Sequence, residues 1–226
     1  MPLSHHLRPP HRLPCGEKPG DESLPPDAAR IWRTPVDIYL TKIIPDGAGL
    51  GGGSADAAFT MLAVNEVFGL GVPQQKLAAL AATIGADCPF FIYNRPMSAT
   101  GIGDVLTDCS VSLKGYKMLL VKSDDISVPT KLAYSRVTPQ VPDIDVTEII
   151  SRPVAEWQGV LKNDFEPSVF ASFPQLSELK ARLLDSGAVY AAMSGSGSSV
   201  FGIFDSANMA ECDKFAEFGN VFDIQL

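Results

Sequence analysis

The sequence predicts an α+β fold, and three observations support this prediction. Residues 36–40 (VDIYL) alternate apolar side chains with exposed ones, which is the period of a half-exposed strand. Residues 174–187 (PQLSELKARLLDSG) repeat apolar side chains at helical spacing and end in a glycine. Two strand-like runs, AVYAAM (188–193) and VFGIF (200–204), follow on either side of a glycine loop. Strands and helices therefore mix, without an internal repeat.

Glycine and proline mark the element boundaries in the first half of the chain. We expect a helix of small residues over 54–68 and a second helix over 74–84, between Pro73 and Gly85. Three strand-like runs follow, PFFIY (89–93), MSATGIGDVL (97–106) with a turn at its glycines, and MLLVK (118–122).

The second half of the chain is richer in helical patterns. Asp164 stands where it would cap a helix in NDFEPSVFASF (163–173). The remaining expected elements are helices at 130–137, 154–161 and 207–218 and a short closing strand at 221–225.

The domain organisation is expected to have three parts. Residues 1–33 are rich in Pro, His and Arg, carry all three histidines and lack an apolar period, so we expect a disordered segment with solvated histidines. A seam near 110–116 then separates an incomplete first domain (34–113) from a second domain (114–226).

Composition excludes several classes of protein. The chain has 226 residues, 46% hydrophobic and 19% charged, and no run approaches the ~18–20 apolar residues of a membrane span. Its four cysteines form no C-x-x-C pair, so we expect free thiols and a cytoplasmic location. The net charge of −8 argues against nucleic-acid or anionic-membrane binding. An acidic chain can still bind a nucleotide through Mg²⁺ and helix N-termini.

The stretch PDGAGLGGGSADAA (45–58) concentrates five glycines in fourteen residues. Glycine is costly in regular structure, so we interpret this loop as a phosphate cradle of bare amides that leads into a helix near Ser54. Gly47-x-Gly49-x-x-Gly52 formally matches the dinucleotide fingerprint, but the preceding strand alternates, which suits an antiparallel sheet. No Gly-Lys-Ser/Thr follows, which excludes a P-loop. A plain glycine hairpin remains the alternative.

Two further segments support a phosphate site. Asp87 in GADCPFF (85–91) has apolar neighbours, so we expect partial burial, which would raise its pKa and suit a general base. The alternative is a turn-capping aspartate. The loop SGSGSS (194–199) offers amides and hydroxyls to a polyanion, or is a hairpin loop.

Five segments in order resemble motifs of the GHMP kinases, a family of small-molecule kinases. They are IIPDGAGLGGGSADAA, GADCPFF, TGIGDVL, NDFEPSVF and AAMSGSGSSVFGIF, and the resemblance covers about Val36 to the C-terminus. It implies the two-domain GHMP fold, with a truncated N-terminal part like ribosomal protein S5 domain 2 and a ferredoxin-like C-terminal domain.

The resemblance also implies chemistry and site residues. It implies ATP and Mg²⁺ as cofactors and phosphorylation of the 2-hydroxyl of a cytidyl-diphospho-methylerythritol substrate, by a monomer or homodimer in isoprenoid precursor synthesis. Asp87 falls on the catalytic aspartate, which takes the hydroxyl proton. The residues implied at the ATP are Pro45, Gly47, Ala48, Gly49, Leu50, Gly51, Gly52, Gly53 and Ser54, and those at the substrate are Thr130, Tyr134, Ser194, Gly195 and Ser196.

The beginning of the chain departs from the family pattern. We find neither the family's N-terminal strand, with its lysine and asparagine, nor its Gly-Tyr-His segment that holds cytosine. We therefore expect an N-terminally altered or incomplete kinase with little turnover alone, since one electrostatic group contributes on the order of 10²–10³ in rate. The alternatives are another GHMP kinase, for homoserine or mevalonate, a non-catalytic nucleotide-binding module, a dinucleotide oxidoreductase and a plain α+β scaffold.

Overall fold

The computed structural model describes residues 36–42, 44, 47–137, 142–205 and 211–226. The chain divides into two units, 1–38 and 39–226, and the packing and site described below lie in the second unit. The expected segment 1–33, Pro45, Cys15 and residues 207–210 of the expected last helix lie outside the described residues.

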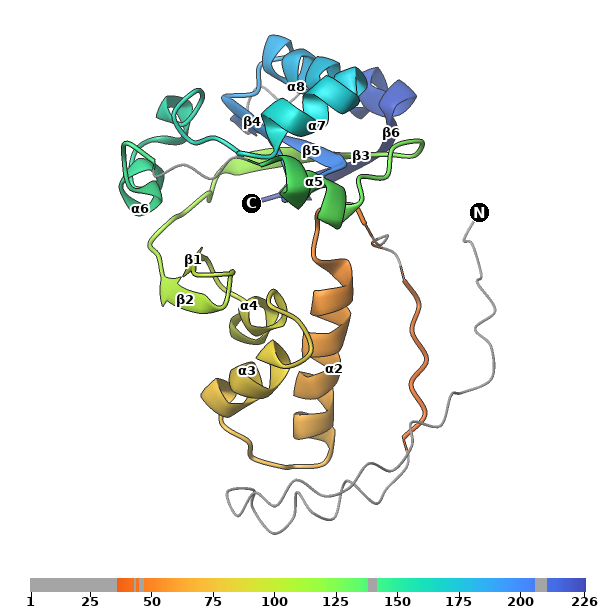
Figure 1. Cartoon of the computed structure of the whole chain (residues 1–226), viewed down its shortest axis with the longest axis vertical. Helices are drawn as coiled ribbons and strands as arrows, with labels where there is room; N and C mark the ends of the chain where they lie inside the picture. Colours follow the sequence, from red (N-terminus) through yellow and green to blue (C-terminus); the bar gives the residue numbers. More distant parts are fainter. Residues whose placement is uncertain (1–35, 43, 45–46, 138–141, 206–210) are drawn as a thin grey trace. The chain divides into compact units, whose positions relative to one another are not determined.

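Runs of helices and runs of antiparallel strands follow one another along the described chain, which confirms the α+β prediction (Figure 1). The α-helices are α2 (Gly52–Val67), α3 (Gln74–Ala82), α4 (Cys88–Tyr93), α5 (Thr130–Arg136), α6 (Val146–Ile150), α7 (Glu166–Ser172) and α8 (Pro174–Asp185). The 3-10 helices are η1 (Val154–Glu156) and η2 (Cys212–Phe218). The strands are β1 (Met97–Thr100), β2 (Val105–Asp108), β3 (Tyr116–Ser123), β4 (Tyr190–Met193), β5 (Ser199–Asp205) and β6 (Gly219–Gln225).

Helix α2 begins at Gly52, two residues before the expected start at Ser54. Its N-cap is Gly51, which has a φ of +64° and offers no side-chain cap. A left-handed residue at this point suits glycine, which has no Cβ to clash. Ser54 therefore lies in the first turn of the helix and is not its N-cap residue.

Helices α2, α3 and α4 share one hydrophobic core. Ala58, Leu77, Ala81 and Ile92 are almost wholly buried in it. The alanines allow close helix approach, because side chains without a γ-carbon leave little volume between the backbones. Asn65 joins α2 to the start of α3, since its side chain bonds both backbone groups of Val72, at 2.9 and 3.2 Å.

The run PFFIY forms helix α4, so the expected strand at 89–93 is wrong. Pro89 stands in the first turn, where its missing N–H costs nothing, and Asn94 ends the helix in the left-handed region. Cys88 and Ile92, four residues apart, are both buried. A run of five apolar residues shows no period, so its burial in a helical core was decided by the neighbouring helices.

The strands form two sheets. Strands β1 and β2 pair as an antiparallel hairpin with Met97 opposite Asp108, which confirms the strand–turn–strand prediction for 97–106. The larger sheet has the order β4-β5-β3-β6, and every neighbouring pair is antiparallel. The predicted strands at 118–122, 188–193, 200–204 and 221–225 all lie in it.

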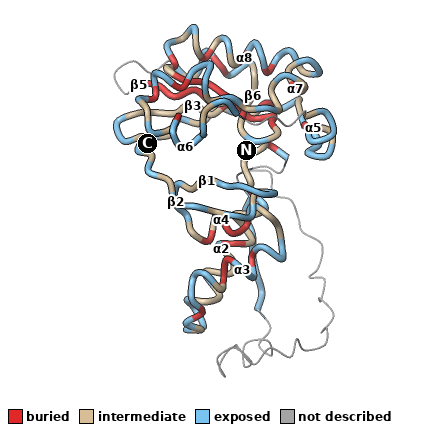
Figure 2. The backbone as a smooth tube through the Cα atoms, turned by 60° about the vertical axis from the view of Figure 1, so that its left-hand side comes forward, coloured by how far each residue is buried: buried red, intermediate tan, exposed pale blue. Residues whose placement is uncertain are grey.

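Both faces of the larger sheet are covered (Figure 2). Helix α8 packs Leu176, Leu179 and Leu183 onto one face, which confirms the amphipathic helix. Each such leucine contributes roughly 1.5–3 kcal/mol by its burial. Gly202 allows the close approach, since a Cβ there would lie 3.3 Å from the Cβ of Leu183. Trp157, with its neighbours after α6, covers the other face.

Three further expectations are wrong. Residues 36–42 form no strand, and Val36, Ile38 and Leu40 are exposed; the alternating pattern finds no strand partner in the described part of the chain. The expected helix at 154–161 is only the 3-10 turn η1 followed by turns that include Gly159, whose φ is +85°. The described end of the expected helix 207–218 is likewise the 3-10 helix η2.

The capping prediction for helix α7 is wrong by one residue. Its N-cap residue has no side-chain cap, and Asp164 bonds none of its first amides. The side-chain oxygen of Asn163 instead accepts the Phe165 N–H at 2.9 Å.

Two findings concern features expected from composition. Cys88, Cys109 and Cys212, the cysteines that the structure describes, are free thiols, as expected. Among the described helices, none is both long and apolar enough to cross a membrane.

Candidate active site

The glycine loop, residues 47–53, runs into α2, and its last two residues, Gly52 and Gly53, are the first two residues of that helix. Gly47, Gly49 and Gly51 all have positive φ values of 64–73°. This alternation turns successive peptide groups and brings the chain into a sixteen-residue helix. The first amides of a helix have no acceptor within it, and the helix dipole adds positive potential there. The loop therefore combines unpaired helix donors with five glycines, which carry no side chain.

Packing explains part of the glycine content of this loop. A Cβ on Gly49 would lie 2.1 Å from the carbonyl oxygen of Ser194, and one on Gly51 would lie 3.0 Å from the Phe91 ring. Gly52 would meet Ile44 at 3.2 Å. The glycines are therefore required by neighbouring groups of the same protein, independently of any bound anion.

A second glycine loop, residues 194–198, contacts the first. The Ser194 hydroxyl donates to the Gly49 carbonyl oxygen at 2.8 Å, and the Ser199 N–H donates to the Ala48 carbonyl oxygen at 3.1 Å. A Cβ on Gly195 would lie 3.0 Å from the Gly49 carbonyl oxygen. Two segments about 145 residues apart in the chain thus form one interlocked surface.

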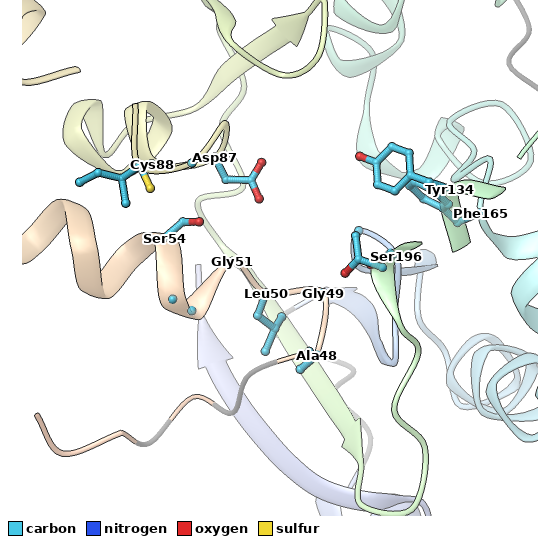
Figure 3. Close-up of a pocket in the computed structure, with 17 residues that line it drawn as sticks. Ala48, Gly49, Leu50, Gly51, Ser54, Asp87, Cys88, Tyr134, Phe165 and Ser196 are labelled. Atoms are coloured by element: carbon cyan, nitrogen blue, oxygen red, sulfur yellow. The ribbon is translucent and has the colours of Figure 1, made fainter. Parts of the chain in front are cut away.

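These loops line a cavity of about 470 Å³ (Figure 3). Most residues that the sequence indicated as site residues lie on its wall, namely Gly47, Ala48, Gly49, Leu50, Gly51, Gly52, Gly53, Ser54, Asp87, Thr130, Tyr134, Gly195 and Ser196. The others are Ser194, whose hydroxyl is bonded to Gly49, and Pro45, which lies outside the described residues. Their individual roles remain predictions.

Asp87 ends the turn that precedes α4 and points its carboxylate into the cavity. In Figure 3 it lies beside Ser54, across the cavity from Tyr134 and Ser196. Asp87 is exposed, so the prediction of partial burial is wrong. Its apolar neighbours Cys88 and Pro89 turn into the helical core, which leaves the aspartate at the solvent side. Any catalytic use of Asp87 therefore rests on its position in the cavity.

An aromatic pair forms the opposite wall. The rings of Tyr134 and Phe165 meet edge to face, with centroids 4.9 Å apart and an interplanar angle of 71°. Tyr134 is 66% exposed, so its ring offers a large free surface to the cavity. Sequence reasoning did not single out Phe165, although it belongs to the NDFEPSVF segment; an apolar residue directly after Asn-Asp at a helix start gave no signal of its own.

A lysine near the glycine loop also escaped sequence reasoning. Lys42 forms an ion pair with Asp56 of α2, with 2.5 Å between Nζ and the carboxylate oxygen. A Cβ on Gly52 would lie 3.5 Å from this Nζ. The pair places a positive charge beside the first turn of α2. In the sequence, only its position three residues before Pro45 pointed to Lys42.

Comparison with known proteins gives two family matches. A model described as GHMP kinases N terminal domain matches residues 23–95, and a model described as GHMP kinases C terminal matches residues 151–212. The first range contains the loop 47–53 and Asp87, and the second contains the loop 194–198.

Individual relatives agree with these matches. A 4-diphosphocytidyl-2-C-methyl-D-erythritol kinase of Bacteroides fragilis is 55% identical over 170 residues, which are 75% of this chain and 62% of that protein. A kinase of the same name from Porphyromonas gingivalis is 47% identical over 193 residues, 80% of this chain and 69% of that protein. The chain spans 62–63% of the length of the first curated relatives it matches.

A solved structure shares the fold. The crystal structure of a 4-(cytidine 5'-diphospho)-2C-methyl-D-erythritol kinase is 33% identical, with a TM-score of 0.68, over 81% of this chain and 68% of that one. The chain therefore belongs to the GHMP kinase family.

Proposed function

We propose that this chain binds ATP on the glycine loop 47–53 and transfers its γ-phosphoryl group to the 2-hydroxyl of 4-diphosphocytidyl-2-C-methyl-D-erythritol. The observation that carries the proposal is the cavity, which residues of the glycine loop and the start of α2 line together with Asp87, whose carboxylate points into it. Phosphoryl transfer requires positioning and charge stabilisation more than covalent chemistry.

The loop is suited to the phosphates. Its amides and the N-terminus of α2 supply donors and a favourable dipole to anionic oxygens. The residues proposed at the ATP are Pro45, Gly47, Ala48, Gly49, Leu50, Gly51, Gly52, Gly53 and Ser54. All of these but Pro45 line the cavity.

Asp87 is proposed as the general base. The acceptor hydroxyl oxygen forms a bond to the γ-phosphorus, and the bond from that phosphorus to the bridging oxygen of ADP breaks. The electron pair of the broken bond stays on ADP, and the hydroxyl proton passes to Asp87. A carboxylate in hydrogen-bond reach of the hydroxyl contributes typically 10²–10⁴ in rate.

Magnesium fits the oxygen groups at this site. In the described part of the chain no group of three or more His, Cys, Asp or Glu residues could hold a metal ion. Mg²⁺ is commonly held by substrate phosphates with one or two protein oxygens, and Ser54 and Asp87 offer such oxygens here. When bound, the ion neutralises phosphate charge.

The acceptor is proposed to lie between Asp87 and the aromatic pair. Tyr134 and Phe165 offer flat apolar surface of the kind on which a nucleobase stacks. Thr130, Ser194, Gly195 and Ser196 are proposed on the same side. The names of the relatives supply the cytidyl identity of the acceptor. We also propose a domain boundary between β2 and β3, which separates 34–113 from 114–226.

The test measures ATP binding and turnover on the full chain. Calorimetry with Mg-ATP reports binding, and a coupled ADP assay reports turnover with the cytidyl acceptor, homoserine and mevalonate. Asp87→Asn should lower turnover by about 10²–10⁴ without changing the ATP dissociation constant much. Asp223→Asn, which changes an exposed aspartate of β6, is the matched control.

Each outcome separates the alternatives. Turnover of the cytidyl acceptor supports the proposal and disproves the expected loss of activity. Turnover of homoserine or mevalonate alone assigns a different acceptor. Binding without turnover indicates a nucleotide-binding module, and absence of ATP binding overturns the proposal entirely.

A further inference from the structure

The side chain of Asn163 uses every hydrogen-bonding group that it has. Its amide nitrogen donates to the carbonyl oxygens of Met193 and Gly195, at 2.7 and 2.8 Å. Its oxygen accepts the Phe165 N–H at 2.9 Å. Two carbonyl acceptors on one side and an N–H donor on the other determine which way the amide faces.

Glu166, the first residue of helix α7, also bonds the end of strand β4. One carboxylate oxygen accepts the Met193 N–H at 2.8 Å, and the other pairs with Lys180 of α8 at 2.6 Å. The side chains of Glu166 and Lys180 are 12% and 21% exposed, so this pair is shielded from most solvent. Both backbone groups of Met193 are therefore held by Asn163 and Glu166.

The held segment is the loop that lines the cavity. Gly195 and Ser196 form part of the wall, and Phe165, whose amide Asn163 accepts, forms the aromatic wall with Tyr134 (Figure 3). The loop 194–198 and the aromatic pair both lie opposite Asp87, and the side chain of Asn163 bonds a backbone group in each of them. A displacement of Asn163 would move both of them relative to the carboxylate.

We infer that Asn163 is a positioning residue that sets the loop 194–198 and the aromatic pair relative to Asp87, with Glu166 supporting the same strand end. This inference rests on the proposed function, because it specifies how the acceptor side of the site is held. Asn163 acts through backbone groups of the loop and is not itself part of the cavity wall.

The sharpest variant is Asn163→Asp, which keeps the shape and replaces the two-proton donor by an oxygen. That oxygen faces two carbonyl oxygens, so the loop has to move away. A misplacement of about 1 Å can cost up to 10² in rate. We expect kcat/KM for the acceptor to fall about 10–100-fold, while the ATP dissociation constant changes less than about threefold, because the loop 47–53 keeps its attachment to α2.

Asn65→Asp is the matched control. Asn65 also bonds backbone groups through its amide, but at Val72, and it does not line the cavity. We expect it to lower the melting temperature and leave kcat/KM unchanged. Equal kcat/KM for Asn163→Asp and Asn65→Asp would overturn the inference. If Asn163→Asp does not fold, Asn163→Ala, which loses the bonds without the repulsion, replaces it under the same criterion.

Hydrogen exchange tests the inference separately from the proposed function. In Asn163→Asp the hydrogen-bonded amides of the loop 194–198, those of Ser194 and Gly197, should exchange about tenfold faster than in the unmodified chain, and in Asn65→Asp they should not. This measurement needs no turnover. Unchanged exchange in 194–198 overturns the inference, whereas absent turnover in the unmodified chain overturns only the proposed function.

Discussion

The two glycine loops of the cavity differ in what holds them. The loop 47–53 is continuous with a long helix, and its Gly49 carbonyl accepts a side-chain hydrogen bond from Ser194. The loop 194–198 joins two short stretches of sheet and is held by Asn163 and by the Ser198 hydroxyl, which donates to the Ile126 carbonyl at 2.6 Å. Only the first loop continues into a long helix, whereas the second depends on the side chain of Asn163 and on its own Ser198 hydroxyl.

Although the two loops are held differently, they share one reason for their glycines, which is the contact between them. In the first loop, glycine is needed at position 49 because the second loop lies against it, with no room for a Cβ beside the Ser194 carbonyl. In the second loop, Gly195 is needed because the first loop is there. Neither requirement involves a ligand, although residues of both loops line the cavity. The predictions below test this mutual dependence, from the largest expected effect to the smallest.

Gly49→Ala should have the largest effect. Its φ of +73° costs an alanine roughly 1–2 kcal/mol, and the Cβ placed 2.1 Å from the Ser194 oxygen forces a backbone shift worth roughly 1–3 kcal/mol more. We expect the free energy of unfolding to fall by about 2–5 kcal/mol and ATP binding to weaken strongly. Urea unfolding and calorimetry measure the two effects.

Gly71→Ala is the control for this variant. Its φ is +62°, but a Cβ there meets nothing within 4 Å. It should therefore cost only the roughly 1–2 kcal/mol of the left-handed conformation. Equal destabilisation by the two variants would show that the loops do not constrain each other.

Ser194→Ala should have a smaller effect. It removes the 2.8 Å hydrogen bond to the Gly49 carbonyl and should cost about 1 kcal/mol. If the free energy of ATP binding falls by the same amount, the ATP dissociation constant should rise about fivefold, which calorimetry would measure. Ser151→Ala, which removes a hydroxyl donor to the Glu148 carbonyl in α6, should leave it unchanged. A shift of similar size in both variants would contradict the coupling.

Tyr190→Phe should have the smallest effect at neutral pH and probes the strand β4 before the second loop. Burial, and then the negative charge of Glu166, raise the pKa of the Tyr190 phenol above its ordinary value of 10.0. The folded state therefore keeps the proton that the unfolded state loses. The contribution of Tyr190 to the free energy of unfolding is therefore fully present below about pH 10, and it is lost as the pH rises from there toward the pKa of the folded state.

The phenylalanine variant should lose less of its stability above pH 10 than the unmodified chain. Near pH 7 it should differ by at most about 1 kcal/mol, since the Tyr190 hydroxyl makes only a 3.3 Å bond to the Leu161 carbonyl. Urea unfolding at several pH values measures both. If the free energy of unfolding fell equally steeply above pH 10 in the variant and in the unmodified chain, the raised pKa would be contradicted.

Local sequence patterns predicted the elements that carry their own signals. Helix α8 has leucines at helical spacing and ends before Gly187, and the strands of the larger sheet are apolar runs between turn residues. The pattern failed where it was short or lacked a partner. PFFIY became a helix because neighbouring helices bury Cys88 and Ile92, and residues 36–40 formed no strand because backbone pairing depends on another segment.

The sequence by itself determined the glycine loops, the helix that follows the first of them and the motif order of the GHMP kinases. Only the tertiary structure decided that Ser194 bonds Gly49, that Phe165 joins Tyr134 and that Asp87 faces them from an exposed position. The physical reason is the separation along the chain over which each kind of interaction acts. Periodicity, caps and turns act over a few neighbouring residues, whereas contacts between loops about 145 residues apart depend on how the sheet and the helices pack.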